Sequence, residues 1–101
     1  MPNEPAEKTP PPIAASIELT NAVGLHARPS VKLTQLAKTF AASVEIALNE
    51  SGPWVDAKSP VKVMRLKAPK GTHLHIRAAG SDAEPAVKAL VDLVAARFGE
   101  E

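Results

Sequence analysis

Four short segments of the chain alternate apolar and polar side chains, and this period of two limits what the chain can fold into. Alternation of this kind is typical of strands that bury one face and expose the other. Other segments have apolar residues about every 3.6 positions, as in a helix with one buried face. The alternating segments predict strands at Ile13–Thr20, Ser43–Asn49, Trp54–Asp56 and Thr72–Ala79.

The first predicted helix begins at His26 or Ala27. Pro29 lies in its first turn, where a missing N–H breaks no intrahelical hydrogen bond. The apolar stripe of this helix continues to Phe40. Lys32 is off the stripe, so its side chain is expected to face water.

Two further helices are predicted. The second helix is short, with Ser59 as its N-cap and a proline at its first position, and it runs to about Leu66. The last helix follows Ser81–Glu84, a capping-box pattern, and runs to about Phe98, before a glycine stops it.

The element order β-α-β-β-α-β-α predicts an α+β fold. Each strand has one apolar face, and two long helices can cover that face. We therefore expect an open-faced β-sandwich: a four-stranded antiparallel sheet with two long helices and one short helix on one side.

The length of 101 residues allows one domain with a small core. Only Phe40, Trp54 and Phe98 are aromatic, so the core must be mainly aliphatic. We expect residues 1–13 to form a disordered proline-rich tail, because Pro10-Pro11-Pro12 favours an extended, solvated chain. The folded domain is then expected over residues 14–101.

The composition excludes several classes of protein. The chain has no cysteine, so disulfide frameworks and thiolate metal sites are excluded. No apolar run approaches the roughly 18 residues of a membrane span, and the N-terminus has no apolar signal core. The net charge of +1 makes no case for nucleic-acid binding. We expect a cytoplasmic protein with no membrane insertion.

The segment Gly24-Leu25-His26-Ala27-Arg28-Pro29 is the strongest functional signal. It places an imidazole where a turn becomes a helix, and helix starts favour anions through unpaired N–H groups and the helix dipole. Arg28 can bind the oxygens of the same anion with its planar guanidinium. The segment predicts that His26 carries a phosphoryl group. The simpler alternative is a turn histidine beside an exposed arginine with no role.

The chain has no sequence that would bind or cleave a nucleotide: a P-loop, a G-x-G-x-x-G segment and a serine nucleophile elbow are all missing. Another protein must therefore supply the phosphoryl group, and another must take it. This favours a phosphoryl-relay protein rather than an independent enzyme, with no cofactor.

The short helix has more apolar surface than a small domain can bury. Val63 and Leu66 can face the sheet, whereas Pro60, Val61 and Met64 lie further round the helix. An exposed apolar surface beside a reactive site suggests a docking patch. Alternatively, these residues merely border the core.

Two weaker patterns remain. The basic residues between Lys58 and Lys70 could attract an acidic partner, although the lack of interleaved aromatic residues argues against nucleic acid. His73 and His75 share one strand face, but two histidines without a carboxylate are a weak metal signal, and we predict no metal site.

At the residues Gly24-Leu25-His26-Ala27-Arg28-Pro29 the chain resembles HPr, the histidine-containing phosphocarrier family of the phosphoenolpyruvate-dependent sugar phosphotransferase system. Ala57-Lys58-Ser59 resembles the second signature of the family, and the resemblance covers about Ala15 to Phe98. It implies that His26 accepts a phosphoryl group on Nδ1 from phosphorylated enzyme I and passes it to a histidine of an enzyme IIA component.

The resemblance also implies roles for the neighbouring residues. Arg28 would neutralise the phosphate, and the helix start at Ala27 and Arg28 would help to stabilise it. Ser59 matches a regulatory serine that a kinase/phosphorylase modifies in some bacteria. Val23 is similar to the nitrogen-related branch of the system, so both sugar uptake and regulation stay open. The implied docking surface for enzyme I and enzyme IIA consists of Ala27, Val31, Pro60, Val61 and Met64.

Two other functions stay open beside the phosphocarrier. One is a regulatory protein-binding module that acts through the Ser59–Met64 surface without obligatory phosphotransfer. The other is a small nucleic-acid-binding domain that uses the Lys58–Lys70 run. We expect a monomer, because a carrier must present one surface to successive partners.

Overall fold

A computed structural model describes residues 12–100 and has the predicted order of elements. The sheet order is β1-β4-β2-β3, and all three strand pairs are antiparallel. This confirms the predicted open-faced α+β fold. The elements are β1 (Ile13–Glu18), α2 (Arg28–Ala37), β2 (Ser43–Ala47), β3 (Val55–Asp56), α3 (Pro60–Arg65), β4 (His73–Ala79), α4 (Ala83–Ala95) and the 3₁₀ turn η1 (Arg97–Gly99).

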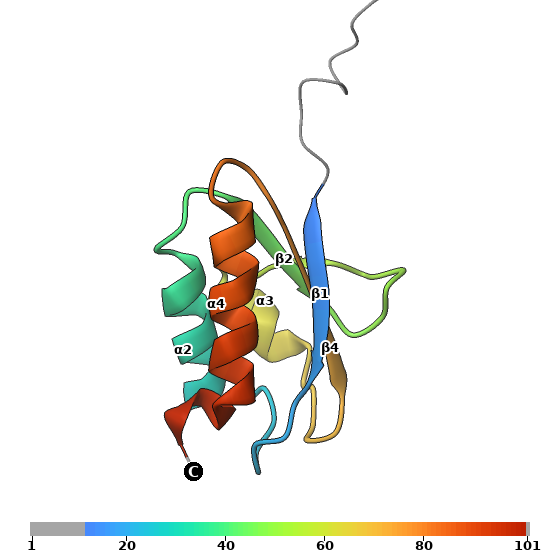
Figure 1. Cartoon of the computed structure of the whole chain (residues 1–101). Coiled ribbons are helices and arrows are strands. Elements are labelled where there is room, and N and C mark those ends of the chain that lie inside the picture. The colour runs from blue at the N-terminus through green and yellow to red at the C-terminus, as the bar shows by residue number, and fades with distance from the viewer. Residues whose placement is uncertain (1–11, 101) are drawn as a thin grey trace, which may run out of the picture.

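The helices cover one face of the sheet (Figure 1). Helix α4 packs on β1, β4 and β2, and α2 packs against both α3 and α4. Leu74 and Ile76 of the central strand β4 are fully buried towards this layer, where Leu74 pairs with Ile17 and Ile76 with Ile46. The core is aliphatic apart from Phe98, the largest fully buried side chain. Strand alternation thus supplies one half of the core and the helical stripes supply the other.

The predicted tail can be compared with the structure only at its end. Ile13, its last residue, pairs with Ala78 as the first residue of β1. Residues 1–11 lie outside the described residues. None of the described helices has the length and apolar character needed to cross a bilayer.

The predicted capping box is wrong. Asp82, not Ser81, is the N-cap of α4, and no side chain caps this helix. The Asp82 carboxylate instead accepts hydrogen bonds from the Ala41 and Ala42 N–H groups, at 2.8 and 2.7 Å. These bonds, Ala41 first, lower the pKa of Asp82. The Asp82 carboxylate thus binds the connection between α2 and β2 and does not cap its own helix.

The last helix also ends earlier than predicted, at Ala95. Arg97 and Phe98 take left-handed backbone angles, with φ of 54° and 58°, and Gly99 follows at 69°. The Phe98 carbonyl accepts a hydrogen bond from Lys32 Nζ at 2.8 Å. This long-range contact accompanies a turn that still buries the Phe98 ring, which is 1% exposed.

Several other elements are also shorter than expected, and β3 and β4 each lack their first predicted residue. Strand β1 ends at Glu18 and β2 at Ala47, two residues before their predicted ends. Helix α2 begins at Arg28 because Ala27 has non-helical backbone angles.

Candidate functional site

His26 is an exposed residue held between two anchored neighbours. On one side, Leu25 is fully buried, and its N–H donates to the Ala68 carbonyl at 2.8 Å. On the other side, Pro29 is buried in the first turn of α2. The loop therefore enters the core immediately before His26 and again soon after it, which leaves the imidazole on the surface.

The backbone at Ala27 has unusual geometry. Its angles of φ 48° and ψ −121° lie outside the regions that side chains with a Cβ atom normally adopt. Helix α2 has no side-chain cap and no acidic residue in its first turn. Its first N–H groups lack intrahelical acceptors, as at any helix start, and no acidic side chain of the first turn opposes them. The start of α2 therefore favours an anion.

Arg28 pairs with a residue that sequence reasoning missed. Its Nη2 lies 3.2 Å from Glu100 Oε1, although 80% of the Arg28 side chain is exposed. Glu100 also pairs with Lys32 Nζ. The Lys32 hydrogen bond, and secondarily the Arg28 charge, lower the pKa of Glu100.

A carboxylate thus already lies between two cations at the start of α2. Lys32 is half-buried and doubly bonded, so the expectation that it faces water is wrong. From the sequence, Glu100 is simply an acidic residue after Gly99. Its place beside α2 depends on the left-handed turn at Arg97 and Phe98. The C-terminal end of the described chain and the start of α2 lie at the same end of the molecule (Figure 1).

Helix α3 begins at Pro60 with Ser59 as its N-cap, as predicted. The Ser59 hydroxyl oxygen accepts a hydrogen bond from the Lys62 N–H at 3.3 Å, as expected of an N-cap. Val63 is fully buried and Val61 is 56% exposed, while Pro60 and Met64 are half-buried. Because α3 packs against α2, this partly exposed apolar surface lies on the helix next to Ala27 and Val31, which are also exposed.

The basic run divides into two kinds of residue. Lys58 has a structural contact: its Nζ donates to the Phe40 carbonyl at 2.8 Å. Four other members are exposed, namely Lys62, Arg65, Lys67 and Lys70. The charge available to a partner is therefore smaller than the sequence suggests, and it lies on and after α3.

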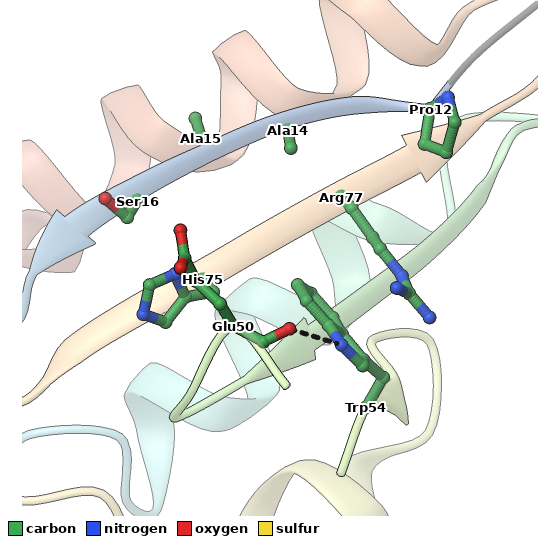
Figure 2. A pocket seen from close by; sticks show the side chains of 8 residues that line it. All are labelled: Pro12, Ala14, Ala15, Ser16, Glu50, Trp54, His75 and Arg77. Carbon is green, nitrogen blue, oxygen red and sulfur yellow. Dashed lines mark hydrogen bonds between the residues drawn. The ribbon is translucent and has the colours of Figure 1, made fainter. Parts of the chain in front are cut away.

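A hollow of about 450 Å³ lies on the open face of the sheet, on the side away from the helices (Figure 2). His75 and Arg77 line it, as does Trp54, whose indole N–H donates to the Glu50 carbonyl. Arg77 pairs with Glu45 at 2.8 Å and stacks over the Trp54 ring at 4.0 Å. These contacts occupy the Arg77 guanidinium, and His26 is not among the lining residues.

Within residues 12–100, no group of three or more His, Asp or Glu side chains is arranged to hold a metal ion. His73 is exposed, and His75 is half-buried in the hollow of Figure 2.

A family model described as the PTS HPr component phosphorylation site matches residues 13–96. The chain belongs to the HPr family. Among its relatives, the phosphocarrier protein HPr of Neisseria meningitidis is 44% identical over 85 residues, covering 84% of this chain and 93% of the relative. The phosphocarrier protein HPr of Cupriavidus necator is 46% identical over 82 residues, covering 81% and 90%.

The phosphocarrier protein NPr of Escherichia coli is 33% identical over 89 residues, covering 88% of this chain and 98% of the relative. The crystal structure of HPr-C-His from Thermoanaerobacter tengcongensis superposes with a TM-score of 0.81 at 38% identity, covering 88% and 98% of the two chains. Membership of the HPr family supports a phosphocarrier role in the phosphotransferase system, with partners such as enzyme I and enzyme IIA components.

Proposed function

We propose that this protein accepts a phosphoryl group on His26 from phosphorylated enzyme I and passes it to an enzyme IIA component. The observation that carries the proposal is the exposed His26 imidazole at an uncapped helix start, with Arg28 and Lys32 on the same helix. A neutral imidazole is a competent nucleophile near neutral pH. The two cations and the helix start supply positive charge for the phosphoryl oxygens.

In the proposed step, the lone pair of one His26 nitrogen forms a bond to phosphorus. The bond from phosphorus to its carrier group on enzyme I breaks, and that group keeps the electron pair. The same exchange in the opposite sense transfers the phosphoryl group to enzyme IIA. Because the resemblance assigns the bond to Nδ1, we propose that atom as the acceptor. Arg28 must exchange its Glu100 partner, at least in part, for phosphoryl oxygens.

Both partners would dock on one surface formed by Ala27, Val31, Pro60, Val61 and Met64. The support for this surface is its exposed or half-exposed apolar area on two packed helices. The exposed basic residues on and after α3 would attract an acidic partner surface. We expect the carrier to work as a cytoplasmic monomer, in sugar uptake or in the regulatory branch.

Ser59 is a proposed regulatory site for a serine kinase/phosphorylase. Its hydroxyl is half-buried and already caps α3. A phosphate at a helix start is electrostatically tolerated, and here it would add negative charge beside the docking surface. Modification of Ser59 would therefore weaken binding of an acidic partner.

The decisive experiment is incubation with enzyme I and phosphoenolpyruvate. We expect one phosphoryl group per molecule, labile in acid and stable in base, that is lost in His26→Ala. Phosphoserine, by contrast, survives acid. His73→Ala is the matched control, because it removes another exposed histidine on β4, and it should accept phosphate like the parent. Acid-labile phosphate that persists in His26→Ala contradicts the proposal.

The second candidate is a regulatory binding module that acts through the Ser59–Met64 surface. The 56% exposure of Val61 favours a partner at this surface with or without phosphotransfer. If His26→Ala and the parent bind a target protein equally well and the parent forms no phosphohistidine, the binding module replaces the phosphocarrier.

A further inference from the structure

Backbone hydrogen bonds to the connection between α3 and β4 hold both ends of the loop that leads to His26. The Leu19 N–H donates to the Thr72 carbonyl at 2.8 Å, and the Gly71 N–H donates to the Leu19 carbonyl at 2.7 Å. At the other end of the loop, the Leu25 N–H donates to the Ala68 carbonyl. Residues 20–24 must bridge these two anchors, so the direction in which the chain reaches His26 depends on the turn that they form.

Asn21 closes that turn with two hydrogen bonds to Gly24. Its side chain is buried, with 1% exposure. Its backbone carbonyl accepts from the Gly24 N–H at 3.2 Å, and its side-chain Nδ2 donates to the Gly24 carbonyl at 2.8 Å. Asn21 therefore binds both polar backbone groups of Gly24, two residues before His26.

Gly24 lies where no residue with a side chain would fit. Its φ is 65°, and a Cβ atom at this position would lie 2.4 Å from the Ala68 carbonyl oxygen. Asn21 Oδ1 has no hydrogen-bond partner among the described residues. The Asn21 side chain therefore contacts the turn through its NH₂ group alone, and its Oδ1 atom is a buried acceptor without a partner in the described part of the chain. An unpaired buried acceptor destabilises the fold, so space filling alone does not account for an amide here.

We propose that Asn21 is a positioning residue that holds the His26 loop in its transfer-competent geometry through the Gly24 carbonyl. This proposal rests on the function proposed above for His26. A displacement of the imidazole by a fraction of an ångström lengthens the path of the phosphoryl group and lowers the rate of transfer. Docking should be spared, because the proposed docking surface includes none of residues 20–24.

The test uses Asn21→Asp, which keeps the shape of the side chain but replaces the NH₂ donor with an acceptor facing the Gly24 carbonyl. We expect kcat for phosphoryl transfer from enzyme I to fall at least about tenfold, with the KM for this protein changed less than threefold. Val87→Ala is the control, because it truncates a buried residue of α4 and destabilises the fold without altering the loop. A kcat for Asn21→Asp equal to that of the parent, or lowered no further than in Val87→Ala, overturns the proposal.

A second measurement does not depend on phosphotransfer. Amide hydrogen exchange at Gly24 and Leu25 should be at least about tenfold faster in Asn21→Asp, while exchange at Ile76 in β4 stays at the parent rate after correction for global stability. Unchanged exchange at Gly24 and Leu25 overturns the role of Asn21, whether or not His26 takes phosphate. A parent protein that takes no phosphate, with fast exchange in the variant, overturns the proposed function and leaves the loop assignment supported.

Discussion

At the scale of single residues, the candidate site stores backbone strain at Ala27. A conformation with φ 48° and ψ −121° persists in a residue with a Cβ atom only when its surroundings impose it. Here the surroundings are the anchored Leu25 on one side and the buried Pro29 on the other. These two fixed points keep His26 outside the regular helix, on the surface before the first turn of α2.

Replacing Ala27 with glycine should relieve this strain. Backbone strain of this kind costs about 1–3 kcal/mol, whereas a glycine adds about 0.5–1 kcal/mol of unfolded-state freedom. The strain relief is larger, so we expect the free energy of unfolding to rise by about 1 kcal/mol in Ala27→Gly. Denaturant titration measures it. Ala95→Gly at the end of α4 is the control and should be destabilising; a loss of stability in both variants contradicts strain at Ala27.

At the scale of elements, ion pairs connect α2 to the residue that follows η1. Glu100 follows η1 and pairs with Arg28 and Lys32 of α2, and Lys32 also binds the Phe98 carbonyl. The Glu100 carboxylate pairs with the Arg28 guanidinium, which a phosphoryl group on His26 would also need. Under the proposed function, Glu100 would compete with the phosphate for Arg28. Its ion pairs also hold the C-terminal turn against α2.

Removing the charge in Glu100→Gln should favour the phosphorylated form. We expect the equilibrium with phosphorylated enzyme I to shift towards phosphohistidine by no more than about fivefold, because exposed ion pairs are weak. Glu84→Gln is the control, since it removes an exposed acid in the first turn of α4. No shift, or an equal shift in Glu84→Gln, contradicts the competition.

The same substitution predicts a pH dependence. The folded state lowers the pKa of Glu100 from its ordinary 4.5, so it favours the charged carboxylate. The stabilisation by Glu100 should be fully present above the ordinary value and should disappear as the pH falls through the lowered one. The thermal midpoints of the parent and Glu100→Gln should therefore differ at pH 7 and converge in acid.

At the scale of the whole molecule, the two faces have different roles. One side of the sheet carries the helices and the candidate site, and the other is open and holds the hollow of Figure 2. The apolar residue that the fold leaves most clearly exposed on α3 is Val61, beside the fully buried Val63. A small core under one sheet face cannot accommodate every apolar side chain of so short a helix, and the remainder is available to partners.

An added charge at this surface should weaken docking and spare the fold. We expect Val61→Asp to raise the KM for this protein in the enzyme I reaction by about tenfold or more, through loss of apolar contact and a new repulsive charge. Its thermal midpoint should stay within about 2 °C of the parent, because exposed substitutions cost little. Ala14→Asp, on the open face, is the control and should leave the KM unchanged. Equal KM values for both variants and the parent would exclude Val61 from the interface.

The sequence by itself determined the order of elements, the apolar face of each strand, the Ser59 cap and the position of His26 beside a helix start. These features depend on periodicity and on neighbours within about four residues, which a sequence displays directly. The Gly24–Pro29 segment was also sufficient to suggest the family, and the family model confirmed it.

Only the tertiary structure decided the partners of Arg28, Lys32 and Asp82 and the burial of Asn21. Lys32 binds a carbonyl 66 residues away, and the Asp82 carboxylate binds N–H groups about 40 residues away. Asn21 bonds locally, but its burial depends on the connection before β4. Charged and amide side chains bind whichever group the packed fold brings within about 3 Å, so no local pattern identifies these partners. The sequence therefore predicted the candidate histidine, whereas the long-range contacts around it came only from the fold.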